Sequence, residues 1–294
     1  MSLPTTDTAV TFPAGSLDEQ AAVLSVLVRD DDLLVVTDRT PFHPVDPTWP
    51  DQGPDRGTIT GAAGGAVVLD CTVGATDGEA LYVGTDIPVR RGETGWAFVV
   101  VHRLPPGGLV LDGGAQVTLT VDAAHRAALS AGHTGCHLAA LALNAALAAR
   151  WRKTPPRADS LGHPDFDQSA IVSSRIEPFG SVDEYRLGRS LRRGGFEPAG
   201  LAADLPALAD RLNAALAGWV GGGGTVRVEV HGPGLTDRRE WVCELPDGTA
   251  RMPCGGTHLG SLADLDGVRV ALALDESGQQ LTMRTTVGTS PHPL

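Results

Sequence analysis

The sequence predicts an α+β fold with two parts: a small β-barrel-like domain over residues 1–120 and an α+β two-layer domain over residues 121–294. Between residues 58 and 121, short β-type runs alternate with glycine turns, which is typical of a small barrel or folded sheet. The stretch after residue 122 is rich in alanine and leucine and has no proline from 125 to 153, which predicts a long helix. A chain of 294 residues is long enough for two hydrophobic cores.

The N-terminal elements follow in order. Residues 17–29 have helical spacing, although their last five residues, SVLVR, equally fit a strand, and residues 33–37 form a short buried-type strand. Residues 41–54 are dense in proline and aspartate and predict an irregular loop. Five further runs are predicted strands, at residues 66–70, 80–84, 96–104, 109–112 and 116–122. His102 and Cys71 lie in or beside these apolar runs, so we expect both to be packed in the core.

The C-terminal half mixes helices and strands. Asp122 is a suitable N-cap for a helix reaching about residue 151, and the Ser181 to Glu184 spacing is that of a capping box opening a helix over 182–193. Residues 205–220 predict an apolar helix that four glycines end. Strands are expected at 225–230, in a hairpin of 240–245 with 249–252, and in a last pair at 268–274 and 280–286.

Composition excludes several classes of protein. The formal charge of −12 argues against indiscriminate nucleic-acid binding, which needs a broad basic surface. No apolar run approaches the length of a membrane span, and the first ten residues lack the features of a secretory signal. Four cysteines do not make a disulfide framework. We therefore expect a cytoplasmic protein that does not contact membranes.

Two short motifs carry metal-binding chemistry. HTGCH at residues 133–137 lies on the first predicted helix, where residues four apart share a face, so His133 and His137 can reach one point. CGGTH at residues 254–258 follows the predicted hairpin and offers a thiolate and another imidazole, from Cys254 and His258. Imidazole and thiolate ligands favour Zn²⁺. The alternative is two unrelated histidine pairs, one packed in a helix and one in a loop.

The CGGTH string also resembles a known family, the AlaX trans-editing proteins and the editing domain of alanyl-tRNA synthetase. Gln52 followed by DRGTI at residues 55–59, and Asp122 followed by Arg126, match further segments of that family. The resemblance extends from about residue 33 to about residue 286. Residues 41–54 depart from it, because the family's tyrosine-proline and glycine run are replaced here by His43-Pro44 and VDPTWPD.

The resemblance implies a zinc-dependent hydrolase, an aminoacyl-tRNA deacylase that acts in trans on the acceptor end of mischarged tRNA. The expected substrates are serine or glycine esterified to alanine tRNA, which gives the protein a role in translation fidelity. One alternative is self-resistance, the hydrolysis of tRNA carrying a toxic threonine analogue such as fluorothreonine. An alternative of another class is a non-catalytic zinc-stabilised domain that binds RNA or protein. The expected metal ligands, which are also the expected catalytic residues, are His133, His137, Cys254 and His258. The alternative for the fourth ligand is a water molecule in the place of His258.

Other residues are candidates for contact with the substrate. Gln52 either faces the substrate or anchors its loop, and Thr134, Cys136 and Thr257 are the nearest candidate walls of an acyl pocket. Cys136 could instead pack in the core or compete as a ligand. We expect Gly132 and Gly135 to leave room for the metal and the substrate. No residue stands out as a dedicated general base, and the candidates are Asp165, Asp167 and a metal-bound water. One face of the helix predicted over 182–193 would carry the basic residues Arg186, Arg189 and Arg193, either for phosphate contact or as a solvated face.

Overall fold

The computed structural model describes residues 3–30, 32–107, 109–155 and 157–288, which form two compact units of mixed α and β structure. The first unit comprises the chain up to residue 127 together with the segments 230–239 and 255–257. The second unit comprises residues 128–229, 240–254 and the chain from 258 onward. The predicted α+β class is confirmed. The division of the chain at residue 120 stays a prediction.

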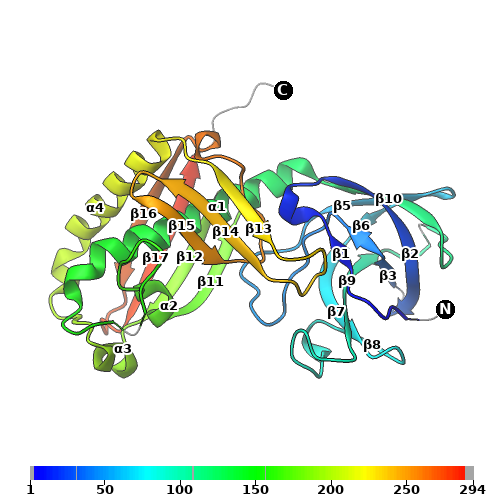
Figure 1. The fold of residues 1–294 in the computed structure, drawn as a ribbon, viewed down its shortest axis with the longest axis horizontal. Helices are drawn as coiled ribbons and strands as arrows, with labels where there is room; N and C mark the ends of the chain where they lie inside the picture. The colour runs from blue at the N-terminus through cyan, green and yellow to red at the C-terminus, as the bar shows by residue number, and fades with distance from the viewer. Residues whose placement is uncertain (1–2, 31, 108, 156, 289–294) are drawn as a thin grey trace. The chain divides into compact units, whose positions relative to one another are not determined.

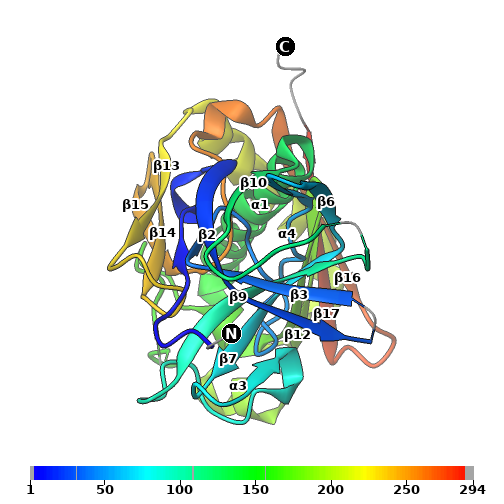
Figure 2. The same ribbon diagram turned by 90° about the vertical axis from the view of Figure 1, so that its right-hand side faces the viewer.

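The first unit is built on an eight-stranded sheet that curls into a half-barrel (Figures 1 and 2). The strand order is β6-β5-β10-β2-β3-β9-β7-β8, and every neighbouring pair is antiparallel. The strands are β2 (Asp18–Arg29), β3 (Asp32–Thr37), β5 (Gly57–Gly61), β6 (Gly64–Val68), β7 (Asp70–Thr76), β8 (Leu81–Val83), β9 (Ala97–Leu104) and β10 (Gln116–Val121). Alternate residues of β10 (Val117, Leu119 and Val121) are buried, as the period of a strand with one core face requires.

One prediction for this unit is confirmed and another is wrong. His102 is fully buried, and its ring nitrogens lie 2.9 Å from the Thr40 hydroxyl and 3.1 Å from the Val35 carbonyl, so the prediction that it packs in the core is confirmed. The strand predicted over residues 109–112 is wrong. Leu109 and Leu111 are buried, but β10 is already paired with β2 and β5 and offers this segment no free edge. The two leucines therefore pack from an irregular segment.

A segment from late in the chain completes the first unit. The short strands β1 (Ala9–Val10) and β4 (Arg39–Thr40) pair in parallel, and the Val10 amide donates to the carbonyl of Pro233 at 2.8 Å. The Leu235 amide donates to Thr8 O at 3.0 Å, and the Leu235 side chain is buried in the core of this unit. Short 3₁₀ turns lie at η1 (Phe12–Ala14) and η2 (Gly84–Asp86).

The second unit places helices against a four-stranded antiparallel sheet of order β11-β12-β17-β16 (Figure 1). Its strands are β11 (Ile171–Glu177), β12 (Gly180–Arg186), β16 (Gly267–Leu274) and β17 (Gln280–Gly288). The long helices are α1 (Ala123–Leu147), which begins in the first unit and is extended by η3 (Ala148–Arg150), and α4 (Leu201–Gly221), which packs on β16. Leucines from both helices share one core with Met283 of β17, so helix and sheet bury a common apolar layer.

Glycine in α1 permits close packing on that sheet. A Cβ added to Gly132 would lie inside van der Waals distance of Glu177 O and 2.6 Å from Gly180 O, and one added to Gly135 would lie 2.6 Å from Val287 Cγ2. Both glycines thus face the sheet. The expectation that they leave room for a metal and a substrate is wrong, because their space is filled by β17, by the first residue of β12 and by the last residue of β11.

The helix predicted over residues 182–193 is also wrong. Residues 180–186 form β12, an inner strand between β11 and β17, and a separate short helix α3 (Arg189–Gly194) follows. The Ser181 hydroxyl donates to Asp183 Oδ2 at 2.8 Å instead of capping a helix. Arg186 therefore ends a strand while Arg189 and Arg193 lie on α3, so the three arginines do not share one helical face.

A three-stranded sheet carries the second motif. Its order is β13 (Val226–Val230), β14 (Arg239–Leu245) and β15 (Gly248–Pro253), and the predicted hairpin of β14 with β15 is confirmed. Cys243 lies opposite Ala250. The remaining elements are α2 (Phe166–Ala170) and η4 (Leu262–Asp264). None of the helices in the described part of the chain is both long and apolar enough to cross a membrane.

Candidate metal centre

The four candidate donors of the two motifs lie together in the second unit. His133 and His137 lie one turn apart on α1, and Cys254 follows the last residue of β15, four positions before His258. The potential donor atoms of these four side chains all lie within 4.8 Å of one another. Cys254 Sγ is 3.5 Å from His133 Nε2 and 3.2 Å from His258 Nε2. Separations of this size between four donors suit a single metal ion at their centre.

Burial differs between the two halves of this donor group. His133 and His137 are buried, whereas Cys254 and His258 are half-buried. The three imidazole rings have centroids 4.4 to 4.9 Å apart, and the Trp241 ring packs 5.0 Å from His137. The two imidazoles from the helix are thus enclosed by protein, and the two donors from the loop after β15 are partly accessible to solvent.

The electrostatics of His137 favour metal binding. Burial, and secondly the neighbouring His133, hold the pKa of His137 well below its ordinary value, so its ring is neutral at neutral pH. Its Nε2 atom is buried and has no hydrogen-bond partner among the described residues. An unpartnered buried nitrogen is costly, and a metal ion bound there would remove that cost. The donor group can therefore hold a metal ion.

Thr134 contacts His258, the imidazole donor on the loop. Its hydroxyl lies 3.3 Å from His258 Nδ1 and accepts a hydrogen bond from the Leu259 amide at 3.2 Å. If the His258 proton sits on Nδ1 and is donated to this hydroxyl, the lone pair is left on Nε2, the atom beside Cys254 Sγ. Thr134 is fully buried, so its observed role is to orient His258, and its contact with a substrate stays a prediction.

Gln52 anchors the second motif within the first unit. Its Oε1 accepts from the Thr257 amide at 3.0 Å, and its Nε2 donates to the Thr257 hydroxyl at 2.9 Å. Both side chains are buried. Of the two roles open for Gln52, the structure shows the anchoring of a loop. Because Thr257 precedes His258 in the chain, this pair of hydrogen bonds restrains the backbone beside a donor. Direct substrate contact by Gln52 or Thr257 stays a prediction.

Cys136 points to a different side of α1 from the two histidines. Its Sγ donates to Asp183 Oδ1 at 3.5 Å, and its buried neighbours are Leu129 and Ile176. Burial, and then Asp183, raise the pKa of the thiol well above its ordinary value, so it stays protonated. It lies outside the group of donors found among the described residues, which favours the core role over competition for the metal. The acyl-pocket role of Cys136 remains a prediction.

The two candidate general bases belong to a buried polar network. Asp165 caps α2 by accepting from the Gln168 amide at 3.1 Å, and it also accepts from Asn144 of α1 at 3.3 Å. The Tyr185 hydroxyl donates to Asp167 at 3.0 Å, and burial raises the pKa of Asp167 to about 6. Neither carboxylate belongs to the donor group. Their fixed partners indicate a structural role, and a role as base stays a prediction.

One residue beside the donor group and one contact that holds its loop were not predicted. Trp241 lies opposite Met252 on the strand next to β15, so the predicted hairpin pairing could have indicated that it packs near Cys254. The contact between Thr134 and Leu259 joins residues 125 positions apart, and nothing in the local sequence signals it.

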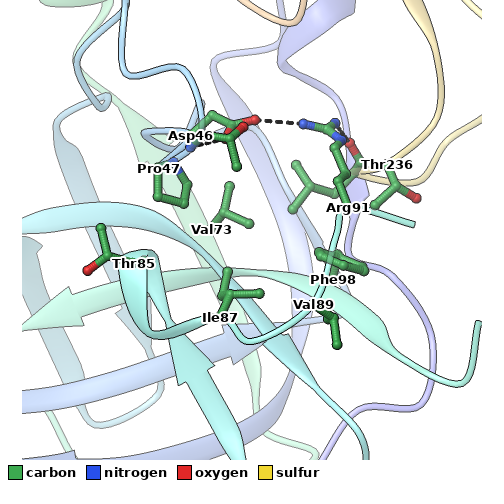
Figure 3. A pocket seen from close by; sticks show the side chains of 12 residues that line it. Asp46, Pro47, Val73, Thr85, Ile87, Val89, Arg91, Phe98 and Thr236 are labelled. Atoms are coloured by element: carbon green, nitrogen blue, oxygen red, sulfur yellow. Dashed lines mark hydrogen bonds and ion pairs between the residues drawn. The ribbon is translucent and has the colours of Figure 1, made fainter. Parts of the chain in front are cut away.

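A pocket in the first unit contains none of the predicted site residues (Figure 3). Apolar side chains including Val73, Ile87 and Phe98 line it, and Arg91 Nη1 lies 2.8 Å from Asp46 Oδ2. Both charged groups already have partners there, since Arg91 also donates to Leu235 O and Asp46 accepts from Thr48. The pocket therefore presents no unpaired charge to a ligand.

By sequence, the chain is similar to part of a tRNA ligase. The chain is 30% identical over 272 residues to the alanine–tRNA ligase of Akkermansia muciniphila, a match that covers 88% of this chain and 24% of that protein. The chain therefore spans about a quarter of the length of this relative. No family model matches the chain.

Two solved structures are similar at 15% identity. They are a fusion DH domain (95% of this chain and 73% of that one, TM-score 0.15) and the bifunctional dehydratase-cyclase domain in ambruticin biosynthesis (92% and 96%, TM-score 0.14). Scores this low support no conclusion about the fold.

Proposed function

We propose that this protein is a zinc-dependent aminoacyl-tRNA deacylase acting in trans. The observation that carries the proposal is the donor group of three imidazoles and one thiolate, together with the similarity of 88% of the chain to part of an alanine–tRNA ligase. The link to tRNA comes from that similarity. The hydrolytic reaction is inferred from the chemistry of the donor group.

The donor set favours zinc over other metals. Three imidazole nitrogen donors and one cysteine sulfur donor match the ligands of Zn²⁺, whereas Mg²⁺ and Ca²⁺ prefer oxygen. A zinc ligand needs a neutral imidazole with a free nitrogen lone pair, and His137 is neutral and has a buried Nε2 without a hydrogen-bond partner among the described residues. A bound zinc ion would supply Lewis acidity for the hydrolysis of a carboxylic ester.

The residues of the chain supply position and access. His133 and His137 would hold the metal from the helix, while Thr134 and the pair Gln52 and Thr257 restrain the loop that carries His258. Cys254 and His258 are half-buried, so this side of the donor group is open to solvent and to an ester. An ester that reached the metal would approach from this side.

The proposed substrates are serine or glycine esterified to alanine tRNA, approached at the acceptor end. A second candidate within the same chemistry is tRNA that carries a toxic threonine analogue. The composition of residues 41–54 supports this second candidate substrate. The loop carries Gln52, and it differs from the tyrosine-proline and glycine run of the family that the sequence resembles. A substrate panel decides between the two.

The test compares two histidine variants on that panel. His137→Ala removes a donor, and His163→Ala removes a histidine outside the donor group. We expect the wild type and His163→Ala to hold about one zinc per chain and to hydrolyse at least one mischarged tRNA. His137→Ala should lose both the zinc and the activity. Full activity in a metal-free sample would refute the proposal.

A structural zinc site is the candidate from another class, because four protein ligands can close a zinc shell. Chelation followed by circular dichroism separates the two. A catalytic site should lose activity with its secondary structure kept, whereas a structural site should unfold when the metal is removed. Stoichiometric zinc without hydrolysis of any aminoacyl-tRNA, combined with unfolding on chelation, would favour the structural role.

A further inference from the structure

Two basic segments of the second unit, separated by residues 154–188, meet around one hollow. The first is Arg152 and Lys153, just after α1 and η3, and the second is α3. The Arg152 amide donates to Gly195 O at 2.8 Å, and Trp151 forms a β-bridge with Phe196. The hollow has a volume of about 460 Å³ and lies at this junction. It is lined by Arg152, Lys153, Arg192, Gly195, Phe196, Glu197, Pro198, Ala199 and Gly278.

A glycine allows the two basic segments to approach each other closely. Gly195 ends α3 with a φ of 110°, in the left-handed region that side chains disfavour. A Cβ at this position would lie 2.9 Å from Lys153 Cβ and 3.1 Å from the Lys153 amide nitrogen. The backbone of the second segment thus approaches the first at a distance that glycine permits and a Cβ would obstruct.

The charge of the hollow is opposite to that of the chain. Three of its lining residues are cationic, and the one acid, Glu197, has its carboxylate 3.3 Å from Arg152 Nε. Within the described residues, no carboxylate lies within ion-pair distance of Lys153 or Arg192. Both are exposed, as are Arg189 and Arg193 on α3. In a chain of formal charge −12, this is a local basic surface with unpaired cations.

We propose that this hollow binds the sugar-phosphate backbone of RNA. Separated cations without counter-ions on a concave surface suit consecutive phosphates, and contacts of this kind position a nucleic acid without selecting its sequence. Arginine can hold a phosphate through two hydrogen bonds, and lysine binds it as a point charge. That the RNA is tRNA rests on the proposed function.

The test reverses two unpaired cations and compares them with a matched pair. One variant carries Lys153→Glu and Arg192→Glu. The control carries Arg211→Glu on α4 and Arg269→Glu on β16, which are exposed and outside the hollow and give the same change in net charge. The measurement is fluorescence anisotropy of labelled, uncharged tRNA with the zinc-loaded protein at several salt concentrations. Circular dichroism checks that both variants fold.

We expect the Lys153 and Arg192 variant to bind tRNA about tenfold more weakly at low salt. The slope of log Kd against log salt should fall by about 1.5 to 2, from the loss of two phosphate contacts. The control should change by less than about twofold. Equal weakening in both variants would mean that net charge alone matters, and unchanged binding in the first would show that the hollow does not contact RNA. Either result overturns the proposal.

Two further measurements separate this proposal from its alternatives. Hydrolysis of 3′-O-seryl-adenosine, an ester without the body of a tRNA, should be equal in the wild type and the hollow variant. If no ester is hydrolysed by any form, the deacylase proposal fails while the anisotropy result still decides the RNA proposal. If a polyglutamate peptide binds the wild type and loses affinity in the hollow variant while tRNA binds both proteins equally, the hollow belongs to an acidic protein partner and the proposal is wrong.

Discussion

Substituting Gly132 by alanine tests whether α1 owes its position to close packing. The added Cβ would be inside van der Waals distance of Glu177 O, 2.6 Å from Gly180 O and 2.8 Å from Gly180 N. All three are backbone atoms of β11, β12 or the ends of their turn, so no side-chain rotation can relieve the overlap. The turn is also tied to the helix, because the Phe179 amide donates to Ala128 O at 2.9 Å.

The expected change in stability combines two opposing effects. Overpacking in a well-packed core costs roughly 1–3 kcal/mol, and more when rigid atoms must move. Replacing glycine by alanine within a helix returns about 1 kcal/mol. Because the obstructing atoms are backbone, we place the cost at or above the top of that range. The net result should be a loss of about 2 kcal/mol in the free energy of unfolding.

Gly218 of α4 is the matched control. It also lies inside a long helix, but an added Cβ would meet no atom within 4 Å. Gly218→Ala should therefore stabilise the protein by up to about 1 kcal/mol through helix propensity alone. Urea unfolding at equal zinc occupancy, followed by near-ultraviolet circular dichroism, measures both variants. A Gly132→Ala protein as stable as the wild type would refute the packing argument.

Two other predictions follow from buried groups. Burial lowers the pKa of His102 to about 4, against about 6.5 in the unfolded chain. The neutral buried ring therefore contributes its full stability above pH 6.5, and about 3 kcal/mol is lost as the pH falls toward 4, at 1.36 kcal/mol per pH unit. In urea titrations between pH 6.5 and 4, His102→Gln should lose less stability than the wild type, and parallel curves would contradict this. Cys136→Ala should cost about 1 kcal/mol, because Asp183 keeps its hydrogen bonds from Ser174 and Ser181, and should leave zinc content unchanged. A shift in acyl preference with unchanged stability would instead support the pocket role of that thiol.

Periodic and short-range features were predictable from the sequence. The long helix α1, the hairpin of β14 and β15 and the shared face of His133 and His137 follow from spacing within a few residues. The proximity of HTGCH to CGGTH was predicted from the matching ligand types of the two motifs and from the family resemblance. Features determined by distant partners were not predictable. The Ser181 to Glu184 spacing is that of a capping box, yet Tyr185 is fully buried in an inner strand paired on both sides, and that pairing outweighs the local signal.

The glycines of α1 show the same limit at the candidate site. Their place next to His133 suggested space around a metal, but which face of the helix is free depends on what packs against the other faces. The approach of Gly180 and Val287 could not be inferred from local sequence. Similarly, the expectation of one basic helix face was wrong. The cations gather instead through the contact of Arg152 with Gly195, a tertiary hydrogen bond.

The segment 230–239 has a consequence for synthesis on the ribosome. The first unit buries Leu235 in its core and uses Pro233 and Leu235 for backbone hydrogen bonds to Val10 and Thr8. These residues are translated more than a hundred positions after the last strand of the half-barrel sheet, β10. The nascent half-barrel must therefore wait, with part of its apolar core unfilled, until most of the chain has left the exit tunnel. Release of a truncated chain before residue 235 would leave that core exposed to chaperones and proteases.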